Sequence, residues 1–231
     1  MFASLTRRFL QFQTLVHLGA LAPFLALLLD IARDNLSVNP IQDITFRTGK
    51  AALVLLVLTL AATPLNTVFG FRAAIRARRA LGLYAFGYAL LHFLIFSMVD
   101  YGLDLPLIWV ETLEKPYIYV GFSAFLILLP LALTSTRGWQ RRLGRTWKRL
   151  HRLVYMAGIL VIIHYVWVVK ADIRQPLAWG VVVLILLAAR LSPLRRYLTR
   201  LRSRLRSRLQ RRRRPTARAV ASSGAANRTT L

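Results

Sequence analysis

The stretch Arg149-Leu-His-Arg-Leu-Val-Tyr-Met-Ala-Gly-Ile-Leu-Val-Ile-Ile-His164-Tyr-Val-Trp-Val-Val decides the fold of this chain. Its apolar part is long enough to cross a membrane, which takes about 20 residues. His151 lies at one edge of the run and His164 lies well inside it. The two are separated by about 20 Å of helix rise, so they sit at different depths. Because an imidazole in hydrocarbon is costly, His164 marks a candidate functional site.

The composition places the whole chain in the membrane class. Of its 231 residues, 56% are apolar, and they fall in long uncharged runs. The sequence contains no cysteine. This excludes disulfides, thiolate-ligated heme, cysteine-ligated iron–sulfur clusters and covalent CxxCH heme attachment, and it leaves the redox compartment open.

Apolar runs predict an all-α integral membrane bundle of six transmembrane helices. The first run continues through Pro23 with no polar stretch after a plausible cleavage site, so we interpret it as an uncleaved span rather than a signal peptide. The last run is short and ends at Arg190. The six segments are residues 10–29, 51–69, 80–99, 117–134, 152–169 and 176–191.

The charges divide the connecting segments into two kinds. The N-terminus, the segments 70–79 and 135–152, and the chain from residue 190 hold 27 of the 33 basic residues and no acidic residue. The alternate segments hold the other six basic residues and all eight acidic residues. Because short loops rich in Lys and Arg stay inside, we expect a multi-pass membrane protein with both termini in the cytoplasm.

We divide the chain into a membrane domain, residues 1–195, and a basic, partly disordered cytoplasmic tail, residues 196–231. A basic amphipathic segment of this kind binds anionic lipids. Its place beside a membrane span favours lipid over nucleic acid, and we expect no nucleic-acid binding. The Ala/Ser/Thr-rich end, residues 216–231, is predicted to be disordered. Leucines at helical spacing, with arginines on the other faces, are Leu198, Leu201, Leu205 and Leu209.

Two of the four histidines are predicted to lie at the same depth. His92 follows Arg79, the last basic residue of its span, by 13 residues, and His164 follows Arg152 by 12. Both spans run outward, so both imidazoles should lie nearer the outer face. Two such histidines are what an axial pair for heme requires. A metal without a porphyrin would need more ligands, and none is available at that depth. The plain alternative is a histidine hydrogen-bonded between helices.

His151 is predicted to lie apart from this pair. On an ideal helix it is turned about 140° away from His164 around the axis. It can ligate a second, inner heme, but the corresponding positions of the third span are Arg78 and Arg79. His17, near mid-depth on the first span, is a weak candidate partner. One heme is therefore the main prediction, and a second heme is the open alternative.

Small and basic residues suggest further contacts with a cofactor. Gly87 and Ala157-Gly158 can let a flat ring approach the backbone, although ordinary helix packing is the preferred interpretation. Arginines of the inner loops can clamp heme propionates or a flavin phosphate, although most of them mark topology. No GxGxxG or P-loop motif is present, so electrons from a nicotinamide would have to be collected by another protein.

Five segments together form a pattern that is specific to one family: Ile41–Gly49, Arg78–His92, Thr134–Thr136, Leu143–His151 and His164-Tyr165. They resemble the MsrQ (YedZ) family, heme-binding membrane subunits of the bacterial protein-methionine-sulfoxide reductase system. The wider resemblance is to the ferric reductase and NADPH oxidase transmembrane domain. It extends from about residue 5 to residue 195 and leaves out the Arg-rich tail.

The resemblance implies a b-type heme held by histidines at the positions of His92, His151 and His164, and a bound FMN. It also implies electron input from the quinone pool or from a flavin reductase. Output would pass to a periplasmic molybdopterin subunit that reduces methionine sulfoxide in oxidised proteins. The catalytic site is then expected on that partner, and this chain is the electron-transfer subunit of the complex.

We therefore expect a transmembrane b-type cytochrome with His92 and His164 as the favoured axial pair. His151 is either an alternative ligand or a ligand of an inner heme. One alternative function is a direct metal-ion or oxygen reductase, against which the missing nicotinamide domain counts. Another is a non-redox transporter or scaffold with structural histidines. The outer segment Asp100–Glu114 is short and carries no catalytic cluster.

Overall fold

The computed structural model describes residues 2–191 together with 194, 196, 199 and 203, and this part of the chain contains helices and no strand. The predicted all-α class is confirmed. The elements are α1 (Phe2–Ala32), α2 (Pro40–Phe69), α3 (Arg72–Leu94), the π-helix η1 (Ile95–Asp100), α4 (Leu105–Glu114), α5 (Pro116–Leu133), α6 (Arg137–Leu150), the 3₁₀-helix η2 (His151–Leu153), α7 (Val154–Val168) and α8 (Arg174–Ala188).

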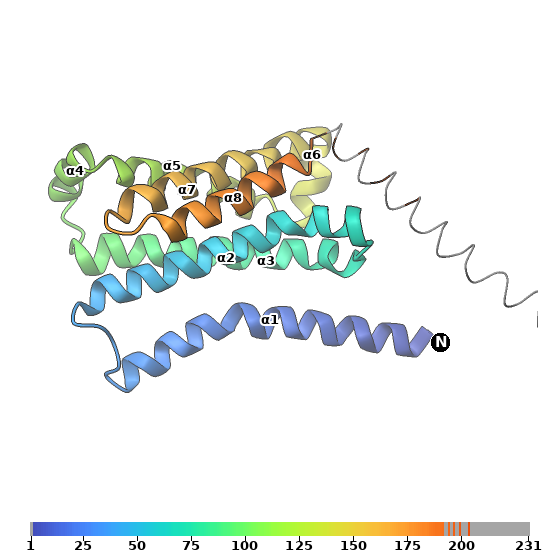
Figure 1. Cartoon of the computed structure of the whole chain (residues 1–231), viewed down its shortest axis with the longest axis horizontal. Helices are drawn as coiled ribbons and strands as arrows, with labels where there is room; N and C mark the ends of the chain where they lie inside the picture. The colour runs from blue at the N-terminus through green and yellow to red at the C-terminus, as the bar shows by residue number, and fades with distance from the viewer. Residues whose placement is uncertain (1, 192–193, 195, 197–198, 200–202, 204–231) are drawn as a thin grey trace, which may run out of the picture.

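The bundle is built from two closely packed helix pairs, α2 with α3 and α5 with α7. Helix α8 packs on α7 and α2, and α1 runs beside α2 and α3 (Figure 1). The buried core between these helices combines leucines with alanines, which lets the helix backbones approach each other closely. Its fully or nearly buried members include Ala20, Leu56, Leu60, Ala85 and Ala157.

Within the described residues, 5 helices are long and apolar enough to cross a membrane, which confirms a multi-pass membrane protein. The sixth predicted span corresponds to α8, an apolar helix of 15 residues, shorter than a perpendicular crossing of about 20 residues requires. The count of six spans and the cytoplasmic position of the termini stay predictions. The five helices are Gln11–Ala32, Pro40–Phe69, Arg72–Asp100, Pro116–Leu133 and Arg137–Val168.

The two kinds of connecting segment lie at opposite ends of the bundle (Figure 1). The α2–α3 turn and α6 lie at the end that holds the basic segments, and the α1–α2 and α7–α8 connections and α4 lie at the acidic end. The segment 135–152 is mostly helical rather than a loop, because α6 is a basic helix kinked at Gly144, whose φ is 48°. We refer to the basic end as the inner end and to the acidic end as the outer end.

Helix α1 is attached to the bundle at a kink. Pro23 lies inside α1, and the Tyr88 hydroxyl enters the helix beside it. The Phe24 amide donates to this hydroxyl at 3.0 Å, and the hydroxyl donates to the Ala20 carbonyl at 2.8 Å. A side chain inserted between a helical amide and the carbonyl four residues earlier bends the helix. Tyr88 thus fastens α1 to α3 in the middle of the membrane domain.

A second proline provides a backbone hydrogen-bond acceptor for the half-buried Arg190 at the inner end. Pro64 lies inside α2 and has no amide hydrogen, so the Leu60 carbonyl lacks its usual helical donor. The Arg190 guanidinium donates to this carbonyl at 2.5 Å and to the Tyr155 hydroxyl at 2.8 Å. Arg190 therefore joins the end of α8 to both helix pairs.

The predicted lipid-binding leucines Leu198, Leu201, Leu205 and Leu209 lie outside the described residues, and so does the end 216–231. The boundary between a membrane domain and a tail at residue 195 stays a prediction.

Replacing Arg190 by Met should lower the stability of the protein by about 1–3 kcal/mol, because a buried carbonyl loses its donor. The loss should be smaller when Pro64 is also Ala, since the new amide can donate to Leu60. Thermal unfolding of the two single variants and the double variant in detergent measures this coupling. Arg174→Met, at the start of the same helix, is the control. Equal losses with and without Pro64 would show that the bond to the Leu60 carbonyl is not what makes Arg190 stabilising.

Candidate functional site

His92 on α3 and His164 on α7 lie side by side between the two helix pairs. Their ring centroids are 6.2 Å apart, and the ring planes are nearly perpendicular, at 86°. The matched depth of the two residues predicted that they would be neighbours, and the structure brings them together. Three residues after His92, at Ile95, α3 continues into the π-helix η1, an irregularity that is frequent at functional sites.

Each imidazole is held by a backbone carbonyl of the helix paired with its own. His92 Nδ1 lies 2.9 Å from the Thr45 carbonyl oxygen of α2, and His164 Nδ1 lies 2.8 Å from the Tyr117 carbonyl oxygen of α5. A carbonyl only accepts hydrogen bonds, so Nδ1 carries the hydrogen in both rings. The Nε2 lone pair of each ring is then free to ligate a metal.

Two glycines let these rings lie against the neighbouring backbone. A Cβ atom added to Gly49, one turn after Thr45, would lie 3.1 Å from His92 Nδ1. A Cβ added to Gly121, one turn after Tyr117, would lie 2.7 Å from His164 Nδ1, closer than real contacts allow.

The glycines considered from the sequence have other surroundings. A Cβ added to Gly158 would face Leu60 and Val183, which agrees with the preferred interpretation of ordinary helix packing. A Cβ added to Gly87 would meet no atom within 4 Å. The sequence patterns did not identify Gly49 and Gly121, which are the glycines that lie against the histidine rings.

The signal that identifies them is a repeated spacing. His92 and His164 each follow the residue whose carbonyl accepts their hydrogen bond, Thr45 or Tyr117, by 47 positions. Each also follows its glycine at the same distance along the chain, so the three residues of the second half lie 72 positions after those of the first half. The site therefore has two similar halves, one formed by α2 and α3 and the other by α5 and α7.

The histidine pair fits an axial role better than a protein-only metal site. Among the described residues no group of three or more metal-ligating side chains is present, and the sequence has no cysteine. Two imidazoles on opposite sides of one metal, with bonds of about 2 Å to nitrogen, have ring centroids about 6 Å apart. The observed 6.2 Å matches this spacing. The remaining ligands would have to come from a planar macrocycle such as a porphyrin.

His151 lies in η2 and is not part of this pair. Its Nε2 is 3.2 Å from the Thr134 hydroxyl oxygen, and its ring stacks on Trp147 with centroids 4.0 Å apart. The Thr134 hydroxyl donates to the Pro130 carbonyl at 2.6 Å, so it accepts from His151, whose Nε2 then carries the hydrogen. The tautomer is therefore opposite to that of His92 and His164.

His17 also lies apart from the pair. On α1, its Nδ1 lies 3.0 Å from the Tyr84 hydroxyl oxygen, and the side chain is exposed. The structure therefore brings together only His92 and His164 of the four histidines.

Two guanidinium groups form a positive cluster near His151 at the inner end. The half-buried Arg78 side chain lies within electrostatic range of Arg190, Tyr155 and His151, and makes no hydrogen bond or ion pair with a described residue. The Nε atom of Arg190 is buried and has no hydrogen-bond partner among these residues either. The eight acidic residues all belong to the outer segments. Such a cluster can bind a carboxylate or a phosphate group.

Comparison with known proteins agrees with this geometry. Residues 48–162 match the family described as the ferric reductase like transmembrane component. The protein-methionine-sulfoxide reductase heme-binding subunit MsrQ of Xanthomonas axonopodis pv. citri is 46% identical over 184 residues, which cover 77% of this chain and 84% of that protein. The subunit of the same name from Ralstonia nicotianae is 47% identical over 178 residues, covering 76% and 82%.

This chain belongs to the MsrQ family. The family match contains His92, His151, Gly49 and Gly121, and it ends two residues before His164. The family resemblance found from the sequence motifs is thereby confirmed. The roles of the individual histidines are not tested by these matches and stay predictions.

Replacing Gly121 by Ala should destabilise the protein by about 1–3 kcal/mol, because the new methyl group overlaps the His164 ring. Gly49→Ala should cost less, since its methyl group meets His92 at a tolerable distance. Gly87→Ala, which meets no atom, is the matched control. Thermal unfolding should therefore rank the variants in the order Gly87, Gly49, Gly121, from most to least stable. A Gly121 variant as stable as the Gly87 variant would contradict the close approach of ring and backbone.

Proposed function

We propose that this MsrQ-family chain is a transmembrane b-type cytochrome that carries electrons for a methionine-sulfoxide reductase system. The observation that carries the proposal is the pair of imidazoles at axial spacing, each with Nδ1 bonded to a carbonyl and Nε2 free. The relatives from Xanthomonas and Ralstonia, named as heme-binding subunits of protein-methionine-sulfoxide reductase, support it.

In this proposal His92 and His164 would be the two protein ligands of one heme b. The heme supplies an iron that gains and loses one electron at a time. The Thr45 and Tyr117 carbonyls fix the orientation and tautomer of the two rings, and such outer partners raise the basicity of the ligand. The surrounding helices keep water from the site.

At the inner end we propose that the cluster of Arg78, Arg190 and His151 binds FMN rather than a second heme. The guanidiniums suit a phosphate group, and the stacked Trp147 and His151 rings offer a flat apolar surface. A second bis-histidine heme would need a partner for His151. The only histidine outside the axial pair that remains is His17, and it is bonded to Tyr84.

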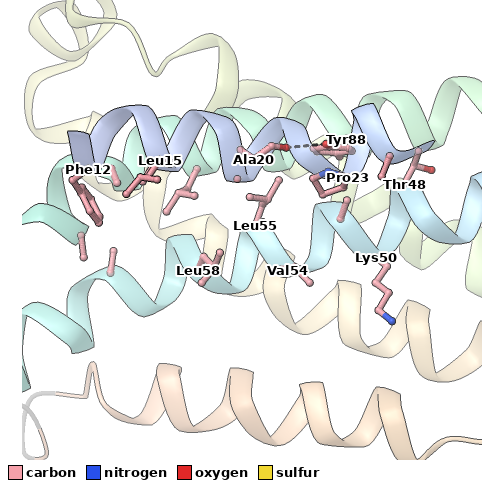
Figure 2. A pocket seen from close by; sticks show the side chains of 18 of the residues that line it. Phe12, Leu15, Ala20, Pro23, Thr48, Lys50, Val54, Leu55, Leu58 and Tyr88 are labelled. Atoms are coloured by element: carbon pink, nitrogen blue, oxygen red, sulfur yellow. Dashed lines mark hydrogen bonds between the residues drawn. The ribbon is translucent and has the colours of Figure 1, made fainter. Parts of the chain in front are cut away.

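Two sources of electrons are compatible with this arrangement: the quinone pool and a cytoplasmic flavin reductase. An apolar cleft of 640 Å³ lies between α1, α2 and α3 inside the membrane domain (Figure 2). Thr48, Lys50 and Tyr88 lie toward one end of it, and Phe12 and Leu15 toward the other. A polar head and an apolar tail suit such a cleft, which favours a membrane quinol. The basic inner end favours docking of a soluble reductase.

The electron acceptor in this proposal is a periplasmic molybdopterin subunit that reduces methionine sulfoxide in oxidised proteins. Each sulfoxide takes up two electrons and two protons and yields methionine and water, so the one-electron carrier must act twice per turnover. The outer end can receive such a partner through α4, which follows α3 and η1 and carries exposed Leu105, Trp109 and Leu113. The hydrogen-bonded ion pair with Lys115 holds the pKa of the Glu111 carboxyl below its usual range, and it places a charged pair beside these apolar side chains.

Replacing His92 or His164 by Ala should abolish or strongly weaken a low-spin heme spectrum, because one axial ligand is lost. His17→Ala should leave that spectrum nearly unchanged, and His151→Ala should lower flavin content more than heme content. Absorption spectra and cofactor analysis of the purified variants measure this. A normal low-spin spectrum in His92→Ala would exclude the proposed axial pair.

Electron delivery to a separate subunit is tested by reconstitution in membranes with a chemical reductant. The heme, once reduced, should be reoxidised on addition of methionine sulfoxide only when the soluble reductase subunit is present. The second electron must arrive before product is released, so two hemes should be reoxidised per sulfoxide consumed. Reoxidation that is equally fast without the soluble subunit would favour a direct reductase.

A further inference from the structure

The carbonyl that holds His92 is also approached by a second side chain. Thr48 on α2 is 1% exposed, and its hydroxyl oxygen lies 3.0 Å from the Thr45 carbonyl oxygen and 2.9 Å from the Ile44 carbonyl oxygen. His92 Nδ1 lies 2.9 Å from the same Thr45 oxygen. The Thr48 hydroxyl has one hydrogen to share between the two carbonyls, and at the Thr45 oxygen it competes with the His92 ring.

More donors approach the Thr45 carbonyl oxygen than it has lone pairs to accept them. A carbonyl oxygen has two lone pairs, and the Thr45 carbonyl also faces the amide of Gly49 in the regular ladder of α2. Three donors thus approach two acceptor sites. When the Thr48 hydroxyl donates to this oxygen, the hydrogen bond from His92 to the same oxygen is weakened.

The second half of the site has no such competitor. The position 72 residues after Thr48 is Val120, which has a methyl group where Thr48 has its hydroxyl. The Tyr117 carbonyl accepts from His164 at 2.8 Å, and no other side chain of the described residues donates to it. The two histidines are thus held by similar backbone geometry but by acceptors of unequal strength.

We propose that Thr48 is a positioning residue that sets the redox potential of the heme through the Thr45 carbonyl and His92. The inference rests on the proposed axial pair. A stronger hydrogen bond from Nδ1 makes an imidazole a more basic ligand and stabilises the ferric iron. By competing for the carbonyl, Thr48 keeps His92 the less basic of the two ligands and shifts the equilibrium toward the ferrous heme.

The test is a pair of isosteric exchanges with opposite predicted effects, measured as heme midpoint potentials in lipid nanodiscs. Thr48→Val should shift the potential to more negative values, by a change in the ferric/ferrous equilibrium of up to about tenfold, or 59 mV for one electron. Val120→Thr should shift it to more positive values, because the new hydroxyl can compete with His164 for the Tyr117 carbonyl. Thr48→Ser keeps the hydroxyl and should retain the original potential.

Thr59→Val is the matched control, because Thr59 is a buried residue of α2 whose hydroxyl donates to the Leu55 carbonyl and has no contact with a histidine. It should leave the potential unchanged. Shifts of the same sign in Thr48→Val and Val120→Thr, or an equal shift in Thr59→Val, would overturn the proposal. So would an unmoved potential in Thr48→Val at full heme content. If His92→Ala keeps a normal low-spin spectrum, the axial pair itself has failed instead.

Discussion

The structure depends on one interaction used twice: a hydrogen bond from a histidine Nδ1 to a backbone carbonyl of the adjacent helix. In an apolar interior an unpaired polar group costs several kcal/mol, so each ring is strongly held in the orientation that satisfies it. The bond from His92 to Thr45 aligns α3 with α2, and the bond from His164 to Tyr117 aligns α7 with α5. Because both bonds use Nδ1, both Nε2 atoms remain available where the two helix pairs meet.

The outer half of the site is nearly repeated after 72 residues, and the departures from the repeat are informative. Thr48 corresponds to Val120. A side-chain hydroxyl therefore competes for the Thr45 carbonyl, whereas the residue at the matching position near the Tyr117 carbonyl has none. At the inner end His151 corresponds to Arg79, so the repeat that builds a histidine pair near the outer face does not build a second one. The inner end instead gathers guanidiniums without carboxylates. One half of the membrane domain is therefore suited to a bis-histidine cofactor, and the other half is suited to an anionic ligand.

Sequence patterns predicted the features that depend on one helix at a time. Apolar runs predicted the spans, and the distance of each histidine from the nearest basic residue predicted that His92 and His164 would meet. Apart from the histidine pair, contacts between side chains and backbones of different helices were not predicted. The first turns of α2 are polar and were excluded from the span, although they supply Thr45 and Gly49. The insertion of Tyr88 into α1 and the bond from Arg190 to Leu60 depend on side chains that meet only after the helices pack.

The geometry of the histidine pair is tested most directly by electron paramagnetic resonance of the oxidised, purified protein. In a low-spin ferric heme, the angle between the two axial imidazole planes controls how anisotropic the signal is. With ring planes at 86°, the account predicts a single, strongly anisotropic low-spin signal. An ordinary rhombic low-spin signal, as parallel imidazole planes produce, or a high-spin signal would contradict the site described for His92 and His164.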